Sequence, residues 1–213
     1  CGEEYDLAIV LDGDKYRLHP KVEAAFLSAK CRAIIDHHES VDNTGYEICA
    51  IDKKAASACD IAFDILQFWG INICQDIAAL IYTGLIFDTG GFKHPNTTPK
   101  THQLASLLLS TGFDHSQIST KILMERKQSG IRLLAHALSG IHYMAGGTIT
   151  ISFVRHEDLL KLGCGQGDFE GIVESMLFIE GVDISCFCIE REKGKIKVSL
   201  RSRCEIDVCQ LAQ

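Results

Sequence analysis

Apolar runs and segments with helical periodicity alternate at the start of the chain. Residues 7–11 (LAIVL) form a continuous apolar strand, and residues 33–35 (AII) form a short run typical of a buried parallel strand. Between these two runs, residues 21–29 (VEAAFLSAK) place apolar side chains at helical spacing. A strand, a helix and a second strand with short connections predict a βαβ unit with parallel strands and a right-handed crossover.

The next part of the chain has helical patterns. Residues 55–69 are apolar at helical spacing and end before Gly70, a residue that commonly terminates helices. Further helical segments are expected at residues 76–87, 102–111 and 115–126.

The pattern changes near residue 127. We expect strands and helices in the order helix 131–143, strand 148–154, helices 157–162 and 171–178, and strands 183–190 and 195–201. This order predicts an α+β module with an antiparallel sheet. The expected fold class is therefore α/β, with a parallel-sheet domain at residues 1–126 and a smaller α+β domain at residues 127–213.

Composition and charge restrict the classes of partner. Hydrophobic residues make up 46% of the chain, which is typical of a globular protein. No apolar run approaches the roughly 18–20 residues of a membrane span, so we expect no membrane partner. The net charge is −7, without a block of Lys or Arg. This balance disfavours long duplex nucleic acid, whose binding depends on phosphate neutralisation, but it leaves small anionic ligands open.

The cysteines do not have the spacing of a zinc or disulfide framework. The chain has ten, and the only close pair is Cys186-x-Cys188, which a strand would place on one face. The others stand singly, several of them within apolar segments, such as Cys49, Cys59 and Cys74. Buried, reduced thiols in a cytoplasmic protein are the favoured interpretation.

Three polar clusters follow apolar segments and carry the candidate chemistry. Asp36-His37-His38 follows the second strand, Asp12 follows the first, and Asp88 follows the apolar segment at 77–87. Because parallel strands end at one edge of a sheet, these side chains are candidates to meet there. Aspartate and histidine suit Mn²⁺, and two ions about 3.5–4 Å apart form a phosphoester-cleaving site. Taken singly, Asp12 also fits an ordinary turn, Asp88 a helix end and the histidines a polar strand exit.

Two other segments have functional and structural interpretations of similar weight. The polar stretch 88–101 (DTGGFKHPNTTPKT) contains Thr98, which fits either a helix cap or a substrate contact. Arg201 and Ser202 end a strand and fit either a solvated strand end or a clamp for phosphate or carboxylate.

Several motifs together resemble the DHH phosphoesterases. They are LDGD at 11–14, IDHHES at 35–40, FDTGGFKHPNTTPKTH at 87–102, GDFEGIVESMLFIEGVDI at 167–184 and KVSLRSRCEIDVCQLAQ at 197–213. The chain is most similar to the bacterial nanoRNase/pAp phosphatase group, in which a DHH domain precedes a DHH-associated domain. The resemblance covers nearly the whole chain.

The resemblance implies roles for individual residues. Asp12, His37 and Asp88 would hold two manganese ions, with Mg²⁺ as the alternative metal. Asp36 would orient the site, and His38 would contact the scissile phosphate or assist proton transfer. Arg201 and Ser202 would contact substrate, and Thr98 is a further candidate because of its place in the polar loop 88–101. The family's first metal motif and its glycine-rich histidine motif are not found in the sequence, so we expect a fragment with weak metal binding and little turnover.

The function expected for the parent protein is Mn²⁺-dependent hydrolysis of short oligoribonucleotides or of 3′-phosphoadenosine 5′-phosphate. A cyclic-dinucleotide or polyphosphate hydrolase is an enzymatic alternative. A non-catalytic nucleotide-binding module is the alternative from another class. The sequence leaves the oligomeric state open, with a homodimer among the options.

Overall fold

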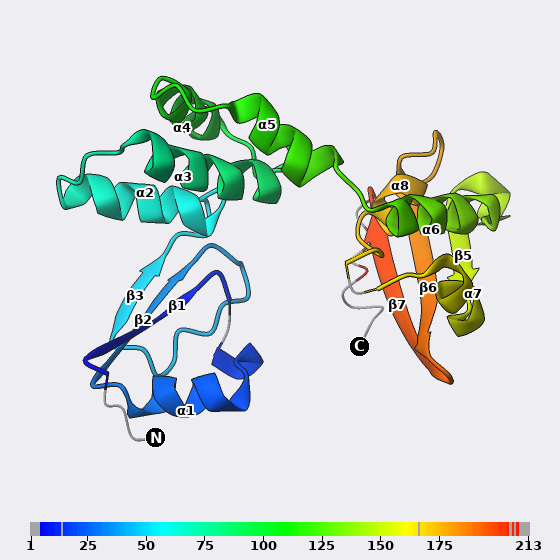
Figure 1. Ribbon diagram of the computed structural model, residues 1–213, viewed down its shortest axis with the longest axis horizontal. Coiled ribbons are helices and arrows are strands. Elements are labelled where there is room, and N and C mark those ends of the chain that lie inside the picture. Colours follow the sequence, from blue (N-terminus) through cyan, green and yellow to red (C-terminus); the bar gives the residue numbers. More distant parts are fainter. Residues whose placement is uncertain (1–4, 14, 166, 205, 207, 209–213) are drawn as a thin grey trace. The chain divides into compact units, whose positions relative to one another are not determined.

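The computed structural model describes residues 5–13, 15–165, 167–204, 206 and 208. It contains two compact units, the first ending at Glu125 and the second beginning at Arg126 (Figure 1). Cys1, Asp14 and residues 209–213, which belong to the sequence patterns above, lie outside the described residues. The assignment of the units to DHH and DHH-associated domains stays a prediction.

A parallel sheet forms the base of the first unit. Strands β1 (Leu7–Leu11), β2 (Cys31–Asp36) and β3 (Ile48–Ile51) lie in the order β1-β2-β3, and both pairs are parallel. Helix α1 (Pro20–Ser28) connects β1 to β2, as the sequence predicted. Strand β3 was not predicted, because four residues between polar segments carry too little periodicity.

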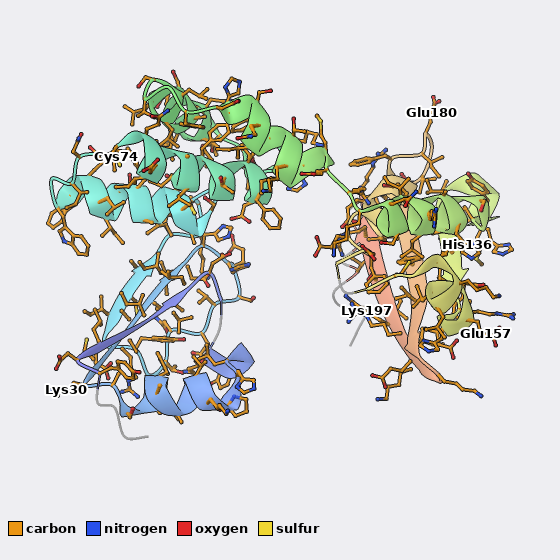
Figure 2. The ribbon with its side chains drawn as sticks, viewed as in Figure 1. Lys30, Cys74, His136, Glu157, Glu180 and Lys197 are labelled. Carbon is orange, nitrogen blue, oxygen red and sulfur yellow. The ribbon has the colours of Figure 1, made fainter. Side chains whose placement is uncertain are left out.

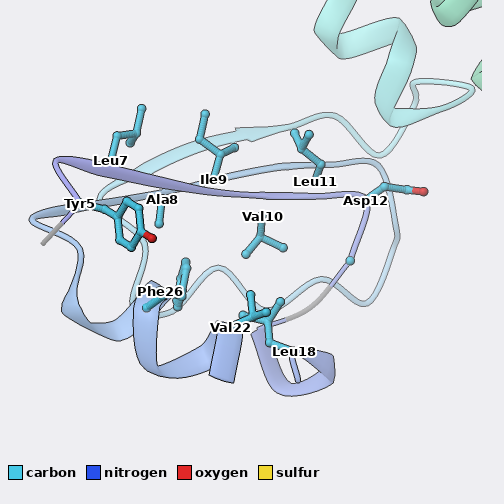
Figure 3. Close-up of a pocket in the computed structure, with 12 residues that line it drawn as sticks. Tyr5, Leu7, Ala8, Ile9, Val10, Leu11, Asp12, Leu18, Val22 and Phe26 are labelled. Carbon is cyan, nitrogen blue, oxygen red and sulfur yellow. The ribbon is translucent and has the colours of Figure 1, made fainter. Parts of the chain in front are cut away.

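The face of β1 is only partly covered. Val10 points toward Val22 and Phe26 of α1, whereas Leu7, Ile9 and Leu11 point to the opposite side and are half-exposed (Figure 3). A cavity of about 510 Å³ follows β1 and α1 and reaches Asp12 at the end of the strand. Its lining is mainly apolar, so it differs in character from the polar cluster at the strand ends.

Helices make up the rest of the first unit. They are α2 (Ala58–Phe68), α3 (Gln75–Asp88), α4 (Pro99–Leu109) and α5 (His115–Ser119), followed by a π-helical turn at Thr120–Met124. The apolar core between them includes Tyr82, Leu85 and Leu108. The expectation of buried thiols is wrong for Cys49 in β3 and for Cys74 before α3, which are both exposed. Ser57 caps α2 by accepting a hydrogen bond from the backbone N–H of Asp60.

The second unit contains a mixed sheet. Strands β4 (His142–Met144), β5 (Ile149–Val154), β6 (Ile184–Glu192) and β7 (Lys195–Ser202) lie in that order. The β4/β5 and β6/β7 pairs are antiparallel, but β5 and β6 are parallel. The predicted antiparallel sheet is therefore wrong at its centre. Two helices, α7 (His156–Leu162) and α8 (Ile172–Leu177), connect β5 to β6 and return the chain to the same direction.

The second unit has its own apolar core. Helix α6 (Gln128–Ser139) contributes Leu133, α8 contributes Met176, and the sheet contributes Val154 and Phe187. Polar side chains such as those of Glu157 and Glu180 are exposed at its surface (Figure 2). The predicted helix 131–143 ends earlier than expected, because the chain turns at Gly140 and enters β4.

Candidate metal centre

The ends of β1 and β2 bring two predicted site residues together. Leu11 pairs with Ile35, and the backbone N–H of Asp12 donates to the Ile35 carbonyl at 3.0 Å. Asp12 has a φ of 53°, in a region that aspartate adopts more readily than most residues. Its Oδ1 lies 3.4 Å from Nε2 of His37, which follows β2. The parallel strands therefore place both groups at one edge of the sheet.

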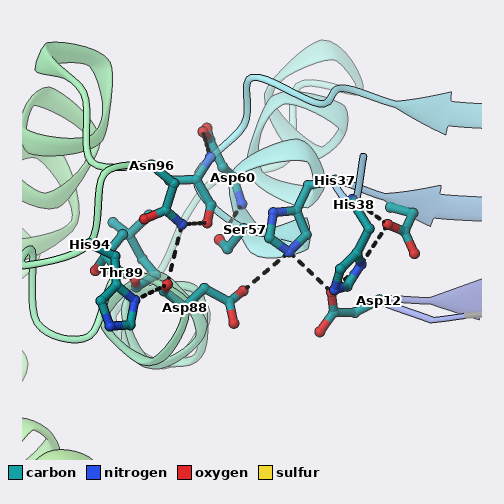
Figure 4. Close-up of polar contacts among 12 residues, drawn as sticks. Asp12, His37, His38, Ser57, Asp60, Asp88, Thr89, His94 and Asn96 are labelled. Carbon is teal, nitrogen blue, oxygen red and sulfur yellow. Dashed lines mark hydrogen bonds and ion pairs between the residues drawn. The ribbon is translucent and has the colours of Figure 1, made fainter. Parts of the chain in front are cut away.

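Asp88 reaches the same imidazole from the helical layer. It is the last residue of α3, and its Oδ2 lies 3.7 Å from Nε2 of His37. His37 thus lies between Asp12 and Asp88 (Figure 4). The three groups proposed from the sequence meet, although Asp88 comes from a helix. Their role as metal ligands stays a prediction.

The electrostatics of this cluster suit a cation. Burial raises the pKa of Asp88, and the negative charge of Asp12 raises it further, against the opposing effect of His37, His38 and His94. Asp12, His37 and His38 also offer ligand atoms within 4.8 Å of one another. Carboxylate oxygens and imidazole nitrogens in this arrangement fit a divalent ion such as Mn²⁺.

Asp36 holds His38 in a defined orientation. The buried Oδ1 of Asp36 accepts from the backbone N–H of His38 at 2.6 Å and lies 2.8 Å from its Nδ1. Burial acts to raise the pKa of Asp36, but the hydrogen bonds from His38 and Gly13 outweigh it, so the pKa is lowered. Because an ionised carboxylate only accepts hydrogen bonds, Nδ1 carries the hydrogen and Nε2 is left available.

Two residues of the loop after α3 contact the backbone carbonyl of Asp88, and neither was predicted as a site residue from the sequence. His94 Nδ1 lies 3.0 Å from the Asp88 carbonyl, and Asn96 Nδ2 donates to the same oxygen at 3.2 Å. Gly90 makes room for the His94 ring, since a Cβ at Gly90 would lie 2.5 Å from its Nε2. In the sequence, the polar, glycine-containing composition of 88–101 marks this loop as a candidate functional segment. It does not predict which of its residues contact Asp88.

The three predicted substrate contacts have structural partners. Thr98 forms a capping box with Thr101 at the start of α4. Arg201 donates from Nε to Oε1 of Glu174 at 2.8 Å, and Ser202 accepts from the backbone N–H of Cys204. The capping interpretation of Thr98 is therefore correct, and its role toward substrate, like those of Arg201 and Ser202, stays a prediction.

The chain is similar to curated proteins that share one name, and two of them illustrate the range of organisms. The bifunctional oligoribonuclease and PAP phosphatase NrnA of Thermus thermophilus is 29% identical over 169 residues, which are 79% of this chain and 50% of the relative. The protein of the same name from Bacillus subtilis is 27% identical over 206 residues, covering 94% of this chain and 64% of the relative. No protein-family model matches the chain.

A solved structure has the same fold. An exopolyphosphatase-related protein from Bacteroides fragilis superposes with a TM-score of 0.89 and 28% identity, over 97% of this chain and 61% of that protein. The chain thus spans between half and two thirds of the length of these relatives. Among the described residues, no helix has the length and apolar character needed to cross a membrane. The chain is a homologue of the bifunctional oligoribonuclease and PAP phosphatase proteins, as its DHH motifs indicated, and it has the α/β fold of an exopolyphosphatase-related protein.

Proposed function

We propose that the protein is a divalent-metal-dependent phosphohydrolase that acts on short oligoribonucleotides or on 3′-phosphoadenosine 5′-phosphate. The observation that carries this proposal is that the carboxylates of Asp12 and Asp88 both lie within 4 Å of the same His37 nitrogen, at 3.4 and 3.7 Å. The names of the two curated relatives support the choice of substrates.

Asp12, His37 and Asp88 would hold the metal, with manganese as the preferred ion. When bound, divalent cations polarise phosphate oxygens and make water a stronger acid. The chain supplies the rest of the chemistry through His38. With its Nδ1 hydrogen directed at Asp36, the half-exposed imidazole presents Nε2 to substrate and can hold or release a proton there.

The substrate is proposed to be small because the chain carries little positive charge. A net charge of −7 favours a short anionic molecule held by a metal and a few specific groups over a polymer held by a basic surface. Thr98, Arg201 and Ser202 are proposed to contribute to substrate binding. For Arg201 this requires the guanidinium to share its donors between the substrate and Glu174.

The test compares two aspartates of the same helix. Asp88→Asn removes the charge beside His37, whereas Asp76→Asn removes an exposed charge in the first turn of α3. Assays of the full-length parent protein with Mn²⁺ and a panel of dinucleotides, 3′-phosphoadenosine 5′-phosphate, cyclic dinucleotides and polyphosphate measure the products. We expect Asp88→Asn to lower turnover by about a hundredfold or more, since a metal contributes several kcal/mol to the transition state. Asp76→Asn should remain near the wild-type rate.

Two outcomes would change the proposal. Wild-type product formation no higher than that of Asp88→Asn on any substrate would contradict hydrolysis by this site. Turnover limited to polyphosphate or to cyclic dinucleotides would retain the site and reassign its substrate.

A further inference from the structure

The candidate metal centre combines groups from two layers of the first unit. Asp12 and His37 extend from the ends of sheet strands, and Asp88 extends from the end of a helix. The 3.7 Å separation between Asp88 and His37 therefore depends on how the end of α3 is held against the sheet. Metal affinity is sensitive to such placement, because the residues that orient ligands affect it strongly.

A single side-chain amide connects these layers. Asn96 Nδ2 donates to the Asp88 carbonyl at 3.2 Å and to the Ala56 carbonyl at 2.9 Å. Two carbonyl oxygens on the same side of the amide can be satisfied only by its NH₂ group, so the orientation of Asn96 is determined. Figure 4 shows Asn96 beside Asp88, with the hydrogen bond to the Asp88 carbonyl drawn as a dashed line.

Ala56 belongs to the segment that leaves the sheet. The backbone N–H of Asp52, directly after β3, donates to the carbonyl of Asp36 at 3.2 Å, and Ala55 N–H donates to Asp52 at 3.0 Å. The N–H of Ala56 faces the buried Oδ2 of Asp60 at 3.4 Å. Hydrogen bonds thus lead from Asp36, next to His37, through residues 52–56 to Asn96 and Asp88.

We propose that Asn96 is a positioning residue that fixes the Asp88 carboxylate relative to His37 and so determines the affinity of the centre for a divalent cation. This inference rests on the proposed function, because it assumes that the three groups bind metal. Asn96 itself touches neither metal nor substrate in this assignment. His94, which faces the same Asp88 carbonyl but does not reach Ala56, supports only the helix end.

The experiment measures Mn²⁺ binding alone, by titration calorimetry on the protein well below its unfolding temperature. Asn96→Leu keeps the approximate size and removes the donor without adding charge, and Asn96→Ala removes the whole contact. Thr97→Val is the matched control, since the buried hydroxyl of Thr97 has no hydrogen-bond partner among the described residues. Leu108→Ala is a second control, because it destabilises the core of the same unit at a residue that is not part of the hydrogen-bonded chain.

We expect both Asn96 variants to bind Mn²⁺ about 10–100-fold more weakly than the wild type. Thr97→Val and Leu108→Ala should keep the wild-type affinity. If the wild type binds no Mn²⁺, the proposed metal centre itself is wrong. Wild-type affinity in the Asn96 variants, an equal loss in Leu108→Ala, or failure of both Asn96 variants to fold would each overturn the positioning role and leave the proposed function standing.

Discussion

At the scale of single residues, the environment of each thiol determines its reactivity. Burial, and then the neighbouring thiol of Cys188 with its sulfur 3.7 Å away, raise the pKa of Cys186 to about 11. A hydrogen bond with Ser202 lowers the pKa of the exposed Cys204. Because the thiolate is the reactive form, we predict that iodoacetamide modifies Cys204 at least about tenfold faster than Cys186 at pH 8.

The raised pKa of Cys186 also predicts how its alkylation rate changes with pH. The thiolate fraction of Cys186 increases about tenfold per pH unit until the pH approaches its pKa, so its rate should still be rising at pH 10. Replacing Cys188 by Ala removes one cause of the raised pKa and should accelerate modification of Cys186. Peptide mass spectrometry follows each site separately, and equal rates for Cys186 and Cys204 at pH 8 would contradict the assignment.

Strand order accounts for two of the predicted site residues, whereas the residues that hold Asp88, which ends a helix, depend on tertiary contacts and were missed. Asp12 and His37 follow parallel strands, so their proximity could be inferred before the structure. Asn96 contacts Ala56, which lies 40 positions away, and no local pattern encodes that pairing. The contact between Arg201 and Glu174 likewise joins a strand to a helix 27 positions earlier.

At the scale of elements, α2 and α3 pack closely where Gly84 has no side chain. A Cβ at Gly84 would overlap Sγ of Cys59 and lie 3.0 Å from its Cβ. We predict that Gly84→Ala destabilises the first unit by about 1–3 kcal/mol, the usual cost of overpacking, despite the higher helix propensity of alanine. Denaturant unfolding of the two proteins measures this difference.

Two further variants test the origin of that cost. In a Cys59→Ala background the sulfur is gone, so Gly84→Ala should cost about 1 kcal/mol less there than in the wild type. Gly130→Ala in α6 is the matched control, because its Cβ would meet neighbours only at 3.6 Å, an ordinary contact distance. An equal cost for Gly84→Ala with and without the Cys59 sulfur would show that the helix contact is not the cause.

Element prediction succeeded where periodicity was long and failed where an element was short or its direction depended on a connection. The helix expected at 76–87 corresponds closely to α3 (Gln75–Asp88). Strands β3 and β4 have only four and three residues, too few for a periodic signal. The direction of β6 follows from the path of the chain through α7 and α8, which the alternation of apolar residues within β6 does not record.

At the scale of the whole molecule, the α/β class was predictable because apolar patterns distinguish a βαβ start from a mixed α+β region. The two cores form from separate stretches of the chain. Leu85 and Leu108 are fully buried in the first unit, and Leu133 and Val154 are fully buried in the second. Each unit therefore has the buried apolar surface that cooperative folding requires.

This division predicts that metal affects only part of the unfolding profile. Asp12, His37 and Asp88 all belong to the first unit, so Mn²⁺ should stabilise that unit by RT ln(1 + [Mn²⁺]/Kd), about 2.7 kcal/mol at a hundredfold excess over Kd. In scanning calorimetry, we expect one transition to move upward with Mn²⁺ and to return on addition of a chelator. The second transition should stay where it is.

A core substitution identifies which transition belongs to which unit. Leu133→Ala removes a side chain with no exposed surface in the second unit and should lower its stability by about 2–5 kcal/mol. The unfolding transition whose midpoint temperature Leu133→Ala lowers should be the one that Mn²⁺ does not shift. His37→Ala should abolish the Mn²⁺-induced shift of the other transition. If Mn²⁺ raised the transition that Leu133→Ala lowers, the metal would bind outside the first unit. A single transition moved by both changes would mean that the two cores unfold together, because binding energy gained in one unit would then stabilise the other.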